Sequence, residues 1–184
     1  MAKDRKIDMV ILGLLAHEDR TGYDIKKQID GGIRFFWKGS FGSIYPALAQ
    51  LEEEGSVRRS GSNENGGREK IVYSITDQGK EVLKAWLRDE KSTNDLKYES
   101  IMKIFFGGAE DRKITLQNID LFQSQIEADL KVLQFYKKNL EKVLDQEDHI
   151  YFYLTVMFGI KSYEAYLRWC ADSKKILSQR RRGE

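Results

Sequence analysis

The sequence predicts a mainly α-helical protein with one small β-hairpin, divided into two parts. Apolar residues recur at helical spacing along most of the 184 residues. Two runs rich in β-prone residues, 56–61 and 69–75, flank a stretch of turn formers. A polar stretch separates this first part from a second part with long helical patterns. We therefore predict a domain at 1–90, a linker at 91–97 and a helical domain at 98–184.

Two amphipathic helices open the first part. The apolar stripe of the first consists of Ile7, Val10, Ile11, Leu14 and Leu15. Thr21 and Asp24 have the spacing of a capping box at the start of the second helix, although Asp is shorter than the usual Glu. Ile25 and Ile29 continue this helix toward a cluster of aromatic residues at 35–37.

Residues 40–54 predict a short third helix with an apolar inner face and a small, hydroxylated and aromatic first turn. Pro46 fits only the first turn of a helix, which fixes where this one begins. A helix N-terminus has free N–H groups and a partial positive charge, so it suits a phosphate group. We interpret this segment as a recognition helix that meets its target with its N-terminal end.

A basic hairpin and a fourth helix follow. Arg58, Arg59, Arg68 and Lys70 lie in the hairpin, opposed only by Glu64 and Glu69. The fourth helix spans about 77–88, and its apolar residues Val82, Leu83, Trp86 and Leu87 are expected to face the core. The order helix, helix, helix, hairpin, helix is the layout of a winged helix-turn-helix.

Composition argues against several other classes of protein. The formal charge of +2 is nearly neutral, so the argument for a nucleic-acid partner depends on local placement of charge. Cys170 is the single cysteine, which excludes an internal disulfide, and its apolar helical position favours packing over redox sensing.

His17 and His149 stand alone, and no metal-ligand spacing or phosphate loop is present in the sequence. We therefore expect neither enzyme activity nor a cofactor or metal. No apolar run is long enough to span a bilayer, and no signal-peptide core opens the chain, so we expect a cytoplasmic protein.

The second part predicts two long helices. From 115 to 144 the apolar positions follow a heptad pattern typical of a coiled coil, with the alternative of an ordinary helix folded back on its own chain. The helix at 150–177 has two apolar faces, and one intrachain neighbour covers only one of them, so we predict a homodimer. The predicted dimerisation residues are Ile119, Phe122, Ile126, Leu133, Tyr153, Ile160, Tyr163 and Leu167.

Several motifs in the first half resemble the PadR-like transcriptional regulators. They are Ile11-Leu12-Gly13-Leu14-Leu15, Thr21-Gly22-Tyr23-Asp24-Ile25, Gly42-Ser43-Ile44-Tyr45-Pro46-Ala47-Leu48, Leu51-Glu52-Glu53-Glu54-Gly55, Arg68-Glu69-Lys70 and Tyr73-Ser74-Ile75-Thr76-Asp77-Gln78-Gly79. The second half is similar in pattern to the C-terminal helical region of the family's virulence-gene activators. The resemblance implies a homodimer that binds a palindromic operator in double-stranded DNA, usually as a repressor.

The resemblance also implies a small aromatic effector, which Trp37, Trp86 and Trp169 would contact, although aromatics at helical spacing are more often core. For Tyr23 a phosphate contact and a core position are both open. The competing function is a winged-helix module that binds a partner protein instead of DNA. The predicted DNA-binding residues are Thr21, Tyr23, Ser40, Gly42, Ser43, Tyr45, Pro46, Gln50, Arg58, Arg59, Asn65, Arg68 and Lys70.

Overall fold

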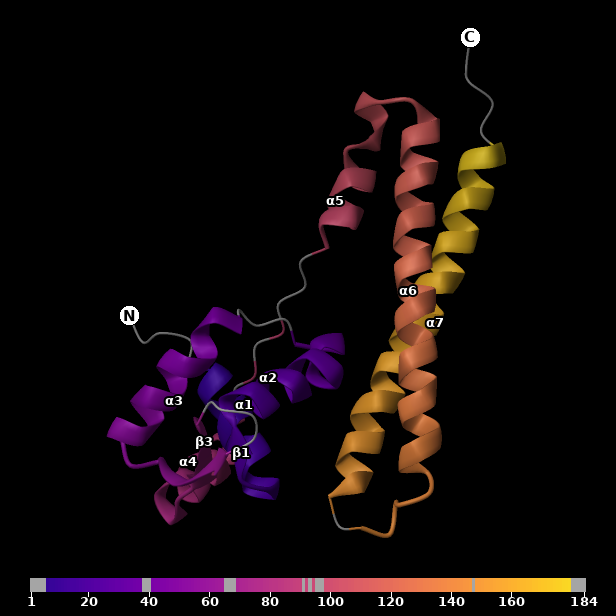
Figure 1. Ribbon diagram of the computed structural model, residues 1–184. Coiled ribbons are helices and arrows are strands. Elements are labelled where there is room, and N and C mark those ends of the chain that lie inside the picture. Colours follow the sequence, from indigo (N-terminus) through magenta and orange to yellow (C-terminus); the bar gives the residue numbers. More distant parts are fainter. Residues whose placement is uncertain are drawn as a thin grey trace. The chain divides into compact units, whose positions relative to one another are not determined.

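The computed structural model describes residues 6–37, 41–64, 69–90, 92, 94, 98–146 and 148–179. It divides into two compact units, Met1–Asn94 and Asp95–Glu184, and the division falls inside the stretch 91–97 expected to link two domains. Each unit is described by itself (Figure 1). Among the described residues, no helix is both long and apolar enough to cross a membrane.

The first unit is helical apart from one small sheet, so the predicted fold class is confirmed. Its elements are α1 (Lys6–His17), β1 (Arg20–Thr21), α2 (Gly22–Gly31), the short 3-10 helices η1 (Ile33–Phe35) and η2 (Phe41–Ser43), α3 (Ile44–Glu53), β2 (Val57–Glu64), β3 (Glu69–Ile75) and α4 (Asp77–Arg88). The helices begin and end close to the predicted positions because apolar periodicity and capping residues mark them in the sequence.

The sheet contains three antiparallel strands in the order β1-β3-β2. The strand β2 extends to Glu64, beyond the predicted end of the run at residue 61. The register shifts between Arg59 and Gly61, which adds local twist to the strand. The strand β1 was not predicted, since two residues are too few for a pattern, yet it fixes the start of α2 against β3.

One apolar core holds α1, α2 and α3 together with the base of the hairpin. Its fully buried side chains include Ile11, Leu12, Ile25, Ile29, Ile44, Leu48, Leu51 and Val57. The helix α4 packs on this core through Leu83. The expectation that Val82, Trp86 and Leu87 also face the core was wrong, because all three are exposed.

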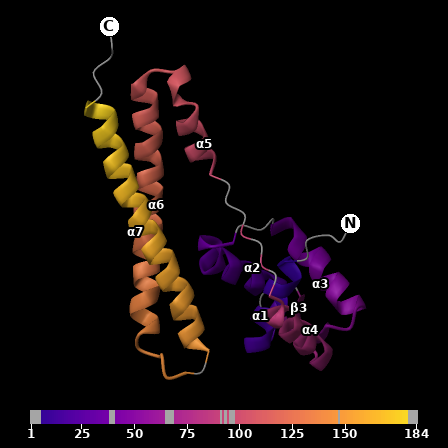
Figure 2. The ribbon, with the colours of Figure 1, turned by 180° about the vertical axis from the view of Figure 1, so that it is seen from behind.

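The second unit is a long helical hairpin with one short helix. Its elements are α5 (Glu99–Phe105), the 3-10 helix η3 (Gly107–Ala109), α6 (Arg112–Leu140) and α7 (His149–Gln179). The helices α6 and α7 run antiparallel side by side (Figures 1 and 2). Gly159 is buried where they meet, and a Cβ atom there would lie 2.9 Å from Cδ1 of Leu133.

Candidate nucleic-acid interface

The helix α3 has a buried face and an exposed face. Its buried side chains are Ile44, Ala47, Leu48 and Leu51. Tyr45, Pro46 and Gln50 are exposed on the other face, together with Gly42 in the 3-10 turn before the helix, and Ser43 is half-buried. Pro46 occupies the first turn, as predicted. A small-residue entry to α3 with an exposed aromatic ring therefore lies at the helix end that suits a phosphate.

The start of α2 has a complete capping box. The backbone N–H of Asp24 donates to Oγ1 of Thr21 at 3.2 Å, and the backbone N–H of Thr21 donates to Oδ2 of Asp24 at 3.3 Å. The Thr21 hydroxyl also donates to Oδ2 at 2.6 Å, and this bond is the main cause of the lowered pKa of Asp24. The short Asp side chain therefore completes the box.

Thr21 is buried, and its hydroxyl is used within the capping box, where it positions the N-terminal turn of α2. A contact of Thr21 with DNA stays a prediction.

Tyr23 lies beside the hairpin. Its side chain is 59% exposed, which excludes the core alternative left open by the sequence. The ammonium of Lys70 lies 5.5 Å from the centre of the Tyr23 ring, a cation–π distance. The start of α2 and the strand β3 thus combine an exposed phenol with a positive charge.

The two described arginines of the hairpin differ in their surroundings. Both are exposed, but Nε of Arg59 lies 2.9 Å from Oε1 of Glu52 on α3. This ion pair joins β2 to α3 and partly neutralises Arg59, a role for Glu52 that the sequence did not indicate. Of the other predicted contact residues, Ser40, Asn65 and Arg68 lie outside the described residues.

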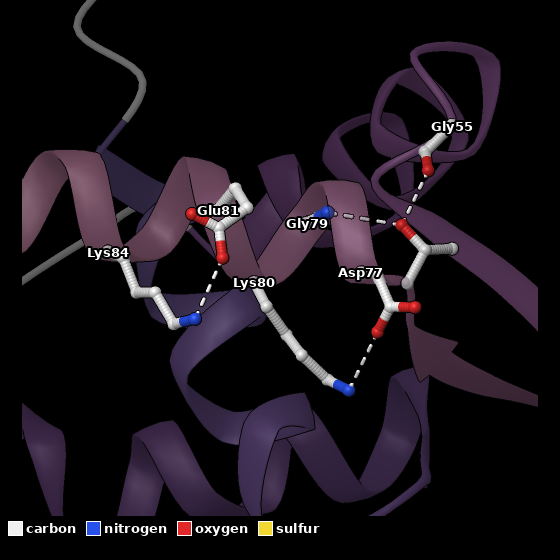
Figure 3. Close-up of polar contacts among 7 residues, drawn as sticks. Gly55, Asp77, Gly79, Lys80, Glu81 and Lys84 are labelled. Carbon is white, nitrogen blue, oxygen red and sulfur yellow. Dashed lines mark hydrogen bonds and ion pairs between the residues drawn. The ribbon is translucent and has the colours of Figure 1, made fainter.

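The turn after α3 is fixed to the start of α4. The Thr76 hydroxyl accepts from the backbone N–H of Gly79 at 3.1 Å and donates to the Gly55 carbonyl at 2.7 Å, as the dashed lines in Figure 3 show. Gly55 has a φ of +72°, in the left-handed region that glycine adopts without strain. These bonds set the direction in which the chain leaves α3 and enters the hairpin.

The predicted dimerisation residues lie mainly inside one chain. Ile119, Ile126, Leu133 and Ile160 are buried between α6 and α7, and Phe122, Tyr153, Tyr163 and Leu167 are half-buried. The four buried residues pack within the chain, whereas the other four keep part of their surface open, and their place in a dimer interface stays a prediction. The second apolar face of α7 is the exposed one: Leu154, Phe158 and Ile176 are each more than half exposed.

Cys170 is fully buried, burial raises the pKa of its thiol, and its predicted packing role fits this position. Within the described ranges, no group of three side chains has the composition to hold a metal ion.

Comparisons with known proteins match this arrangement over both units. Residues 11–85 match the transcriptional regulator PadR-like family, and residues 96–178 match the virulence activator alpha C-terminal domain. The negative transcriptional regulator PadR of Bacillus subtilis is 27% identical over 173 residues, covering 90% of this chain and 93% of that protein.

Two solved structures of Bacillus subtilis PadR are similar to this chain at 25% identity. The complex with operator DNA has a TM-score of 0.83 and covers 95% of this chain and 99% of that one. The complex with p-coumaric acid has a TM-score of 0.71 and covers 94% and 99%.

Proposed function

Because the chain belongs to the PadR-like family of transcriptional regulators, we propose that it binds a palindromic operator in double-stranded DNA as a homodimer and represses transcription in the cytoplasm. The observation that carries the proposal is the two-sided helix α3, which is anchored by buried apolar side chains and exposes Tyr45, Pro46 and Gln50. The operator complex of Bacillus subtilis PadR supports the DNA partner, and that relative's description as a negative regulator supports repression.

Each part of the surface has a different role in this proposal. The entry to α3, with Gly42 and Ser43, approaches a groove and its phosphates, while Gln50 reads a base edge. Lys70, Arg58 and Tyr23 contact the phosphate backbone from the hairpin and the start of α2. Because the net charge is only +2, the proposed binding depends on this local placement.

The proposed dimer uses the exposed apolar face of the second unit. Both long helices leave large apolar side chains exposed, including Leu121 and Phe135 on α6 and Leu154 and Phe158 on α7, and such surface commonly marks an interface. A second copy of the chain would cover this face and hold two winged units for two half-sites.

A small aromatic acid is proposed to release the repressor. The p-coumaric acid complex of Bacillus subtilis PadR supports this. The check is to add p-coumaric acid to the protein–operator complex and follow its dissociation.

The deciding experiment is fluorescence anisotropy on the DNA upstream of the protein's own gene, against a scrambled duplex, at two salt concentrations. We expect tighter binding to the upstream DNA and a steep loss with salt, because bound phosphates release counterions. No binding even at low salt would contradict the proposal and favour the alternative of a module that binds a partner protein.

Two substitutions assign roles within that experiment. Lys70→Ala should weaken binding to all sequences and reduce the salt slope by about one unit, whereas Gln50→Ala should change which sequences bind. Lys161→Ala is the matched control, since it removes an exposed charge from α7 in the second unit.

A further inference from the structure

Gly22 is the first residue of α2, and it is buried although it begins a helix. Its backbone does not require glycine, because Gly55 is the one residue with a positive φ in the described part of the chain. The reason for a glycine at this position therefore lies in its surroundings.

The ring of Tyr45 occupies the space that a side chain at position 22 would fill. A Cβ atom on Gly22 would lie 2.7 Å from Cε1 of Tyr45, closer than real Cβ contacts come, and 3.2 Å from Cζ, which is tighter than most of them. The next neighbour, Cδ1 of Leu48, would be at 3.4 Å, an ordinary contact. The first turn of α2 therefore contacts the first turn of α3 at this point, with Gly22 against the ring of Tyr45.

The ring depends on this contact because most of the Tyr45 side chain is open. It is 64% exposed, while its neighbours Ile44 and Leu48 on α3 are buried. A change in where the ring lies against α2 would therefore also move its hydroxyl.

We propose that Gly22 is a positioning residue for DNA recognition: by lacking a side chain it seats the ring of Tyr45 against α2, and so sets where Tyr45 meets the DNA. The inference rests on the proposed DNA-binding function and assigns a role to a residue outside the predicted contact set.

Gly22→Ala should displace the ring without damaging the fold. The atoms that clash belong to the outer end of a largely exposed side chain, and alanine favours a helix more than glycine does. We expect an unchanged or higher urea midpoint, and about tenfold weaker operator binding, the size of one lost hydrogen bond to a charged phosphate. Gly32→Ala, at the other end of α2, is the matched control, since its Cβ would meet only the Gln28 carbonyl oxygen at 3.7 Å.

A double-mutant cycle separates positioning from a general structural effect. If Gly22 acts through the ring, Gly22→Ala has no further effect on DNA affinity in a Tyr45→Ala background. An equal loss of affinity in both backgrounds would overturn the proposal.

A second readout does not depend on DNA. In protein labelled with 3-fluorotyrosine, with the Tyr45 signal assigned by Tyr45→Phe, the fluorine resonance should shift in Gly22→Ala and stay in place in Gly32→Ala. An unshifted resonance would overturn the proposed contact even where DNA binding is intact. If the resonance shifts but the wild-type chain binds no DNA, the contact is supported and the proposed function fails.

Discussion

Among the described glycines of the winged unit, Gly79 has the least room for a side chain. A Cβ atom there would lie 2.1 Å from the Ser56 carbonyl oxygen and 2.9 Å from Cγ1 of Ile75. Because the first of these is backbone, Gly79→Ala has to shift the connection between α3 and β2, and we expect a loss of about 2–3 kcal/mol in the free energy of unfolding. Urea unfolding measures this loss, and hydrogen exchange locates it in the first unit.

Gly13→Ala is the control for the Gly79 substitution. It introduces the same methyl group on a helix, but apart from the adjacent residues and the backbone of its own helix no atom lies within 4 Å of the new Cβ. Gly13→Ala should therefore be neutral or stabilise the protein by up to about 1 kcal/mol. If the two substitutions change the free energy of unfolding equally, the close approach of Gly79 to the Ser56 carbonyl is absent.

Asp24 makes the stability of α2 depend on acid pH. The hydrogen bond from Thr21 lowers the pKa of Asp24 below its ordinary value in the folded chain. A lowered pKa in the folded state adds stability above the unfolded pKa, and this stability is lost as the pH falls through the folded value. Asp24→Ala should therefore cost about 0.5–1 kcal/mol at pH 7, and the difference from wild type should begin to shrink below about pH 4 and be lost once the pH falls below the folded pKa.

Unfolding by urea at several pH values tests the Asp24 prediction. Thr21→Ala removes the other half of the capping box and should show the same pH dependence. A difference between Asp24→Ala and wild type that persists unchanged at pH 3 would contradict the assigned cause.

At the scale of elements, the close contact between α6 and α7 gives a prediction about packing. Leu133 is 2% exposed, and Gly159 leaves the space that its Cδ1 occupies. Leu133→Ala should cost about 3 kcal/mol through the cavity it creates. Gly159→Ala should destabilise the wild type but much less so the Leu133→Ala variant, where its methyl group fills vacated space. Hydrogen exchange of the α6 and α7 amides measures the stability of this helix pair in each variant. If the losses of stability from the two substitutions simply add, Leu133 and Gly159 are not in contact.

The elements themselves were largely predictable from the sequence, because the helices have apolar periodicity and recognisable caps. The periodicity did not show which surface each apolar face packs against. The pattern of α4 marks Val82, Trp86 and Leu87 as one apolar face, yet only Leu83 beside them reaches the core. Likewise the heptad residues Ile119, Ile126 and Leu133 of α6 are already buried within the single chain.

The candidate site was predictable where it depended on one short motif. The turn around Tyr45 and Pro46 was identified from its residues, and the structure exposes it. The contacts made across the fold were not predictable: Glu52 on Arg59, Lys70 over Tyr23 and the Tyr45 ring over Gly22 each join two elements. Helical periodicity and capping motifs describe residues within one element, so they do not predict contacts between residues of different elements.

At the scale of the whole molecule, the proposed binding to a palindromic operator requires two winged units at a set spacing. A dimer formed through the exposed apolar face of the second unit would provide that spacing. We expect a dimer at micromolar concentration by sedimentation, and a monomer for the double variant Leu154→Asp with Phe158→Asp, which places two charges on the exposed face of α7. Thr155→Asp, an exposed residue between them, should remain a dimer. A wild-type monomer at this concentration would remove the basis for the proposed assembly.

The same variants test the link between assembly and DNA recognition. Half-sites whose centres lie about 10 bp apart, or a multiple of this, face the same side of the duplex, and inserting about 5 bp turns one of them to the opposite side. Wild-type affinity should therefore fall sharply with the insertion, whereas the monomeric variant should bind both duplexes with equal, weaker affinity, because each winged unit then binds a half-site alone. Anisotropy on the two duplexes measures both. If the insertion leaves the wild-type affinity unchanged, the two winged units are not held at a fixed separation, even if the protein is a dimer.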